Sequence, residues 1–163
     1  MLDPIDVEII SLLQENARLP QAEIARTVGL APSAVLERLR KLEGKGVITG
    51  YAAQIDPRAL DQRLLAFIAV RTTDRPGEGR VANELAAVRE VLEVHHVAGD
   101  DCYLLKVRAR DAEHLGQILR QQIASTASVT STRTTIVLET VKEDPRIAIP
   151  KELTLSDLAR SEP

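Results

Sequence analysis

Aromatic side chains are scarce in this sequence: its 163 residues include two tyrosines, one phenylalanine and no tryptophan. We therefore expect a core built from Leu, Ile, Val and Ala, without the aromatic platform on which proteins stack single-stranded nucleic acid. Cysteine is equally scarce. Because Cys102 stands alone, the chain can form neither an internal disulfide nor a cysteine-based zinc cage.

Long hydrophobic runs are also missing. No apolar stretch approaches the roughly 18 residues of a membrane-spanning helix, and the residues from Met1 to Asp3 do not resemble a secretory signal. We expect a cytoplasmic protein that does not enter a membrane. An excess of positive charge is missing as well, since 21 basic and 24 acidic side chains give a formal charge of −3. The global charge therefore gives no support to nucleic-acid binding.

The spacing of the apolar residues divides the chain in two. Up to about Gly46 they recur at helical intervals, whereas from Leu64 onward extended runs rich in Val, Ile and Thr appear. Pro57 lies between the two halves, where proline interrupts regular structure. We expect a helical domain over residues 1–50, a linker over 51–63, a second domain over 64–142 and a tail over 143–163.

The first half predicts three helices and a short strand. Asp3 and Pro4 begin the first helix as N-cap and first helical residue, Gly29 ends the second helix, and Pro32 starts the third. The predicted helices cover residues 4 to about 16, 21–28 and 32 to about 43, and the strand covers 47–51. A short helix, a glycine turn and a longer helix form a helix-turn-helix, whose second helix enters the DNA major groove.

The third predicted helix carries local positive charge. Its residues Val35, Leu39 and Leu42 face the core, so the opposite face is exposed. Residues 33–46 contain four basic and two acidic side chains, which places a basic excess where groove binding requires one. The simpler alternative is a three-helix bundle with an ordinary solvated face. The residues opposite the buried stripe are Ser33, Ala34, Glu37, Arg38 and Lys41.

The second half repeats a strand–helix–strand pattern, with strands at 64–73, 91–98, 102–109 and 129–141 and helices at 79–88 and 112–124. Two such units predict a ferredoxin-like sandwich, in which two helices cover one face of a four-stranded antiparallel sheet. The whole chain is thus expected to be α+β. The strand at 64–73 is apolar on both faces, and because helices cover only one face, we expect the sheet of a second subunit to cover the other.

Five segments together resemble the leucine-responsive/asparagine regulator (Lrp/AsnC) family of transcription factors. They read GLAP at 29–32, LERLRKLE at 36–43, GVITGY at 46–51, VAGDDCYLL at 97–105 and STRTTIVL at 131–138. The resemblance spans residues 2 to about 141. It implies an N-terminal winged helix-turn-helix, a C-terminal ferredoxin-like ligand-sensing (RAM) domain, and dimers that assemble further, often into octamers.

We therefore predict a transcriptional regulator that binds a pseudo-palindromic site on double-stranded DNA as a homodimer, with half-sites about 34 Å or a multiple of it apart. Positively charged side chains and the start of the second helix would hold the phosphates, and the start of the third helix at Pro32 would approach the base edges. The predicted phosphate contacts are Gln21, Arg38, Arg40, Lys41 and Lys45. The predicted base contacts are Ser33, Ala34, Glu37 and Arg38.

An amino-acid effector is the second prediction. Gly99 allows the backbone to approach a ligand closely, Asp100 or Asp101 can hold an ammonium group, and the hydroxyls of Thr132 and Thr134 can serve a carboxylate. In the resembled family, amino acids bind near the residues that match this turn, where Cys102 replaces a frequent acidic residue and His96 a bulkier apolar one. The alternative is a β-turn that uses Gly and Asp for its own geometry.

We expect no catalytic residue, metal or cofactor. His95 and His96 are adjacent, so they point to opposite faces of a strand, His114 has no partner at a metal-binding spacing, and the carboxylate beside Cys102 disfavours a thiolate. Two alternatives stay open: an enzyme built on the ferredoxin-like domain, and an amino-acid-sensing module that acts through protein partners. For the tail, we expect a loosely ordered terminus, with docking of a partner as the alternative.

Overall fold

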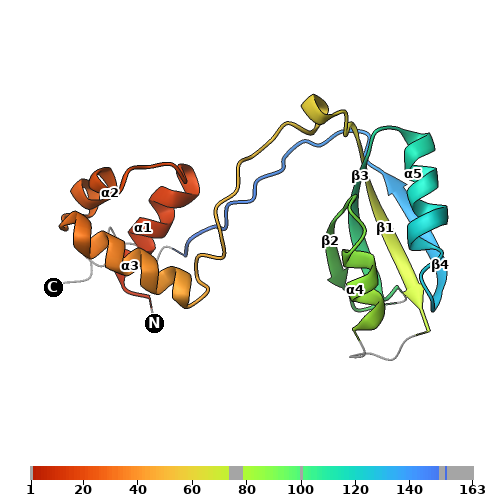
Figure 1. Ribbon diagram of the computed structural model, residues 1–163, viewed down its shortest axis with the longest axis horizontal. Helices are drawn as coiled ribbons and strands as arrows, with labels where there is room; N and C mark the ends of the chain where they lie inside the picture. Colours follow the sequence, from red (N-terminus) through yellow and green to blue (C-terminus); the bar gives the residue numbers. More distant parts are fainter. Residues whose placement is uncertain (1, 74–78, 100, 151–152, 154–163) are drawn as a thin grey trace. The chain divides into compact units, whose positions relative to one another are not determined.

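The computed structural model describes residues 2–73, 79–99, 101–150 and 153 (Figure 1). The chain forms two compact units, which we call the helical unit (Met1–Gln54 with Glu143–Pro163) and the sheet unit (Ile55–Lys142). The chain therefore leaves the helical unit, builds the sheet unit and returns. None of the helices in the described ranges is long and apolar enough to cross a membrane.

The helical unit contains the three predicted helices. Asp3 caps the first one, because its carboxylate accepts the backbone N–H of Asp6 at 2.8 Å while Asp6 reaches back to the N–H of Asp3. The helices are α1 (Pro4–Glu15), α2 (Gln21–Val28) and α3 (Pro32–Gly44). They enclose a small aliphatic core of Ile9, Ile24, Ala25, Val35, Leu39 and Leu42. The helical part of the prediction is confirmed.

The strand predicted at 47–51 is wrong. The backbone N–H groups of Val47 and Ile48 both donate to the carbonyl oxygen of Leu42, at 2.9 and 3.2 Å. They close the C-terminal end of α3 and are thus not available to a strand ladder. Gly46, with φ of +67°, allows the chain to turn back in this way.

The sheet unit has the predicted ferredoxin-like order. A short 3₁₀ helix, η1 (Pro57–Leu60), precedes a four-stranded antiparallel sheet with the order β2-β3-β1-β4. The strands are β1 (Leu64–Thr72), β2 (Val91–His96), β3 (Tyr103–Ala109) and β4 (Val129–Ile136), and the helices are α4 (Arg80–Ala86) and α5 (Ala112–Ile118), which continues as the π-helical turn η2 (Leu119–Ile123) (Figure 1).

The two faces of β1 have different surroundings. Ala66, Ile68 and Val70 are fully buried in the core that α4 and α5 share with the sheet. Phe67 points the other way and pairs with Lys106 of β3 and Thr135 of β4. Leu65 and Ala69 share the face of Phe67. The core cluster that the structure describes draws its helix residues from α4, α5 and η2, which all lie over the first face.

The last strand is shorter than predicted. β4 ends at Ile136, followed by one more backbone bond from the N–H of Val137 to the carbonyl of Leu65 at 2.9 Å. Within the described residues, no ladder pair between β1 and β4 extends beyond Ile136. Leu138 and Val141 are accordingly 99% and 90% exposed.

Candidate DNA interface and effector site

The turn between α2 and α3 fixes how the third helix is presented. Gly29 ends α2 in the left-handed region at φ +70°, a conformation that costs other residues energy. The N–H of Leu30 donates to the carbonyl of Ala25 at 2.9 Å, and α3 begins two residues later at Pro32. With the inner side of α3 buried through Val35, Leu39 and Leu42, the opposite side faces solvent.

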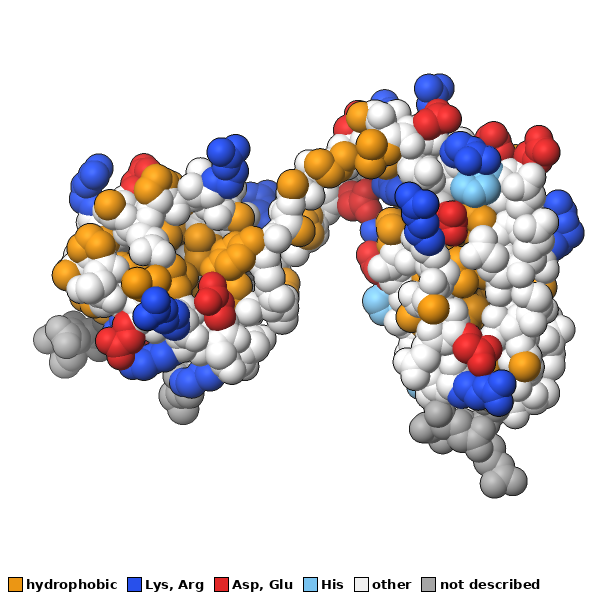
Figure 2. Space-filling view, in the orientation of Figure 1, with side chains coloured by type: hydrophobic (Ala, Val, Ile, Leu, Met, Phe, Trp, Pro, Cys, Tyr) orange, Lys and Arg blue, Asp and Glu red, His pale blue; other side chains and the backbone are white. Residues whose placement is uncertain are grey.

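Most of the residues predicted to contact DNA lie on that exposed side. Ala34 is half-buried, and so is Arg38. Figure 2 shows basic side chains distributed over the helical unit, with apolar surface between them. The exposed members of the predicted set are Gln21, Pro32, Ser33, Glu37, Arg40, Lys41 and Lys45.

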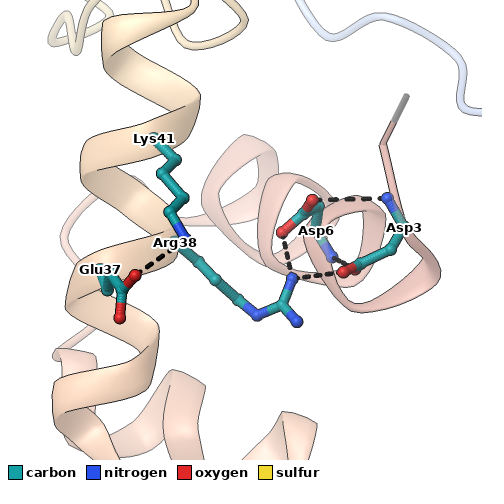
Figure 3. A network of polar contacts seen from close by, with 5 residues as sticks. All are labelled: Asp3, Asp6, Glu37, Arg38 and Lys41. Atoms are coloured by element: carbon teal, nitrogen blue, oxygen red, sulfur yellow. Dashed lines mark hydrogen bonds and ion pairs between the residues drawn. The ribbon is translucent and has the colours of Figure 1, made fainter.

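Arg38 does not extend freely from α3. A single guanidinium nitrogen, Nη1, donates to Asp3 Oδ2 at 2.5 Å and to Asp6 Oδ1 at 2.6 Å, so that one side chain of α3 joins both members of the α1 capping box (Figure 3). These hydrogen bonds raise the pKa of Arg38. Partial burial acts to raise the pKa of Asp3, but the hydrogen bonds from Arg38 and from backbone N–H groups outweigh it and lower that pKa.

A second ion pair reduces the positive charge of α3 further. Lys41 Nζ lies 2.8 Å from Glu37 Oε1, one helical turn away, and this contact lowers the pKa of Glu37 (Figure 3). Arg40 and Lys45 carry the remaining basic charge of the helix, and no ion pair within the described ranges involves either of them. Counting basic residues treats Arg38 and Lys41 as equal to Arg40 and Lys45. In the unbound protein, however, acidic side chains neutralise the charges of Arg38 and Lys41.

The predicted effector residues are only partly brought together. Gly99 adopts φ +128°, which only glycine readily accepts, and Asp100 lies outside the described residues. Asp101 Oδ2 accepts a 2.6 Å hydrogen bond from Arg133 Nη2 of β4. Cys102 is half-buried, with Sγ 3.5 Å from the backbone nitrogen of Thr72.

Thr132 and Thr134 lie on the other face of β4. They pair with Val70 and Ile68, whose side chains face the helix-covered core, whereas Arg133 pairs with Ala69 on the open face. The structure therefore puts Arg133, and not the two threonines, beside Asp101. Sequence reasoning missed Arg133, although a basic residue in the middle of a threonine-rich strand was a visible signal.

Comparison with known proteins assigns both units. Residues 2–49 match the family model of a winged helix-turn-helix DNA-binding domain, and residues 65–147 match that of the Lrp/AsnC ligand binding domain. The chain belongs to the Lrp/AsnC family. It is 41% identical to the HTH-type transcriptional regulator FL11 of Pyrococcus horikoshii over 149 residues, which cover 91% of this chain and 97% of that protein.

Two further relatives extend the comparison. The leucine-responsive regulatory protein of Escherichia coli is 38% identical, over 91% of this chain and 92% of that protein. The structure of a feast or famine regulatory protein from Mycobacterium tuberculosis, complexed with L-methionine, superposes with a TM-score of 0.83 at 37% identity, over 90% of this chain and 99% of that chain.

These findings confirm the predicted family, the α+β fold class and the general function. This Lrp/AsnC protein is a DNA-binding transcriptional regulator, and its relatives are regulators, not enzymes. The enzyme alternative is therefore set aside. The match of residues 2–49 to a DNA-binding model also speaks against a module that acts through protein partners alone.

Proposed function

We propose that this protein is a cytoplasmic regulator that binds a pseudo-palindromic DNA site through α3, in an amino-acid-dependent manner. The observation that carries the DNA part is the anchored helix: Val35, Leu39 and Leu42 fix one side of α3 in the core, and its other side is exposed. Arg40, Lys45 and the start of α2 at Gln21 contact phosphates, and Lys41 remains paired with Glu37. Ser33, Ala34 and Glu37 reach the base edges.

Arg38 takes a different role in this proposal. Its guanidinium is occupied by Asp3 and Asp6, so we assign it to positioning α3 against α1 and not to base contacts.

Selection from a random DNA pool tests the DNA part. The purified protein is expected to enrich one motif, and Ser33→Ala or Glu37→Ala is expected to change the preferred bases at defined positions. Arg63→Ala in the sheet unit, an exposed arginine paired with Asp61, serves as the control and should leave the motif unchanged. A pool without enrichment, from protein shown to be folded, would refute the proposal.

An amino acid is the proposed effector, and the Asp101–Arg133 pair supports the proposal. The pair combines a carboxylate for an α-ammonium group with a guanidinium for an α-carboxylate, 2.6 Å apart on the open side of β4. A bound amino acid would break the hydrogen bond between Asp101 and Arg133 and form its own contacts with both side chains. Gly99 would leave room for the backbone of the amino acid. The L-methionine complex of the tuberculosis relative supports the ligand class.

Calorimetry with L-methionine, followed by the other amino acids, tests the effector part. Asp101→Asn and Arg133→Gln should each weaken binding by about 1.5–3 kcal/mol, the typical contribution of a hydrogen bond to a charged group. Arg63→Gln is the matched control. If no amino acid binds to folded protein, or if both variants bind like the parent, the site assignment is refuted.

We further propose a homodimer that buries the open sheet face, with assembly into octamers. Leu65, Phe67 and Ala69 of β1 and Leu104 of β3 form an apolar strip on that face, by the pairing of the strands. Light scattering at several protein concentrations distinguishes monomer, dimer and octamer, and a monomer at all concentrations would refute the proposal.

A further inference from the structure

The chain returns to the helical unit through a segment that lies against α1. Residues 145–150 run in an extended conformation along a groove of about 880 Å³, which α1 and residues 47–54 form together with the segment itself. Neither the predicted DNA contacts nor the effector residues include any part of this groove. Its apolar lining includes Ile10 and Leu13 of α1 and Tyr51 of the chain that leaves α3.

Gln14 of α1 holds the segment by its backbone. The side-chain Oε1 accepts the N–H of Ile147 at 2.7 Å, and Nε2 donates to the carbonyl oxygen of the same residue at 3.1 Å. An amide side chain that satisfies both backbone groups of one residue replaces the neighbouring strand of a sheet. The contact engages backbone atoms of the segment and spans 133 residues of sequence.

Side chains of the segment complete the contact. Ile149 is half-buried and lines the groove, and Ile147, which also lines it, is 79% exposed. Arg146 pairs with Asp144 at 3.0 Å, and that contact raises the pKa of Arg146, with a smaller contribution from Glu15 of α1. The charge of the segment thus complements the end of α1.

The chain connects the two units twice, and the contact at Gln14 acts on the second connection. The helical unit is joined to the sheet unit once on the way out, near Ile55, and once on the way back, near Glu143. Without the contact at Gln14, only the outgoing linker would restrain the DNA-binding helices. With it, both ends of the sheet unit are fixed to the helical unit, and the second connection starts at β4, the strand that carries Arg133.

We propose that residues 145–150 form a clasp, an extended segment docked on α1, which restricts the reach of the recognition helix α3 and so sets the DNA half-site spacing that the dimer accepts. The spacing role rests on the proposed function, whereas the docking does not. A single flexible connection tolerates many separations between two binding modules, and a second connection narrows that range.

The experiment uses full-length protein and has two arms: hydrogen exchange of the Ile147 backbone amide, and DNA affinity as a function of half-site spacing. Gln14→Ala removes both hydrogen bonds to Ile147, and Ile149→Asp disrupts the covered side independently. Gln122→Ala, the same change at an exposed glutamine of the sheet unit, is the control. In both clasp variants, exchange of the Ile147 amide should become at least about fivefold faster, consistent with the net contribution of one hydrogen bond.

The DNA arm uses the fragment that the parent protein selects from a random pool, with about 5 base pairs, half a helical turn, inserted between the half-sites. The parent should bind the fragment with the insertion much more weakly than the original fragment. In the clasp variants, the ratio of the two affinities should be at least about fivefold smaller than in the parent. The control should retain both parental values.

Each other outcome refutes a specific part of the proposal. Unchanged exchange in both clasp variants shows that Gln14 does not hold the segment and refutes the clasp. Faster exchange with an unchanged spacing penalty shows that the segment docks without restricting α3, which refutes its role. A parent protein that binds no DNA refutes the proposed function and the spacing role with it, while the exchange arm still decides whether the clasp exists.

Discussion

Replacement of Arg38 by alanine separates a positioning role from base recognition. The guanidinium makes two charge-assisted hydrogen bonds, to Asp3 and Asp6, and the three side chains are 27%, 46% and 18% exposed. Such bonds contribute about 1.5–3 kcal/mol each when desolvated, and solvent screening reduces this at partly exposed sites. We therefore expect Arg38→Ala to lower the free energy of unfolding of the helical unit by about 1–2 kcal/mol.

Thermal unfolding and DNA binding measure the effect together. For a unit of this size, that destabilisation corresponds to a decrease in Tm of roughly 5–10 °C. DNA affinity should fall by a similar factor on every sequence, because displacement of α3 weakens its interactions with all sequences alike. Arg38→Lys retains one donor nitrogen, which is all that the pair of bonds uses, and should recover part of the stability.

Arg40→Ala is the matched control on the same helix. It should keep the stability within about 0.5 kcal/mol of that of the parent. Because Arg40 is proposed to bind phosphate, its removal should reduce the slope of log affinity against log salt by about 0.9 per phosphate that it neutralises. The positioning role is refuted if Arg38→Ala keeps the parental Tm and relaxes the preference for one base. That result would instead support a contact between Arg38 and a guanine.

Three further predictions concern the turn, the sheet and the pH dependence. Gly29→Ala should destabilise the helical unit by roughly 1–2 kcal/mol, because no atom lies within 4 Å of the added Cβ and only the left-handed backbone conformation disfavours alanine. Denaturant unfolding measures this destabilisation. Asparagine tolerates the left-handed conformation better, so an equal destabilisation in Gly29→Asn would contradict the prediction. Phe67→Glu should shift the proposed dimer to monomer in sedimentation experiments without unfolding the sheet unit, and an unchanged sedimentation coefficient would exclude this face from the interface. The folded-state pKa of Asp3 is lowered below its usual value of 3.8, so its stabilisation is complete above that value and is lost as pH falls through the folded pKa; the Tm difference between parent and Arg38→Ala should shrink below about pH 4, and a constant difference would refute the linkage.

The ends of the helices could be predicted from the sequence, because they depend on residues close to one another along the chain. Asp3, Pro4, Gly29 and Pro32 mark the ends of α1, α2 and α3, because capping and turn geometry depend on neighbouring residues. The sheet followed from the repeated strand–helix–strand pattern of the second half, whose extended runs are rich in Val, Ile and Thr. The strand predicted at 47–51 failed because β-branched residues need a partner strand, and here their N–H groups close α3.

Long-range contacts were beyond the sequence. Arg38 and Asp6 are separated by 32 residues and Gln14 and Ile147 by 133, so no window of the sequence brings them together. The tail was expected to be a loosely ordered terminus because Pro145 and Pro150 break regular structure; in its described part, the backbone of Ile147 pairs with a side chain of α1. The Asp101–Arg133 pair was missed for a related reason: strand register decides which residues of β4 share a face with the turn.

The compensated charges on α3 set a salt dependence that counting basic residues would overestimate. If Arg38, Arg40, Lys41 and Lys45 all neutralise phosphates, a dimer neutralises about eight and the slope of log affinity against log salt is about −7. In the unbound protein, Arg38 is bound by Asp3 and Asp6 and Lys41 by Glu37, which leaves Arg40 and Lys45 and a slope of about −4. We expect the smaller value for a selected fragment titrated over a range of salt concentrations. A slope near −7 would mean that DNA draws Arg38 and Lys41 out of their ion pairs, and the assignment of Arg38 to positioning would then fail.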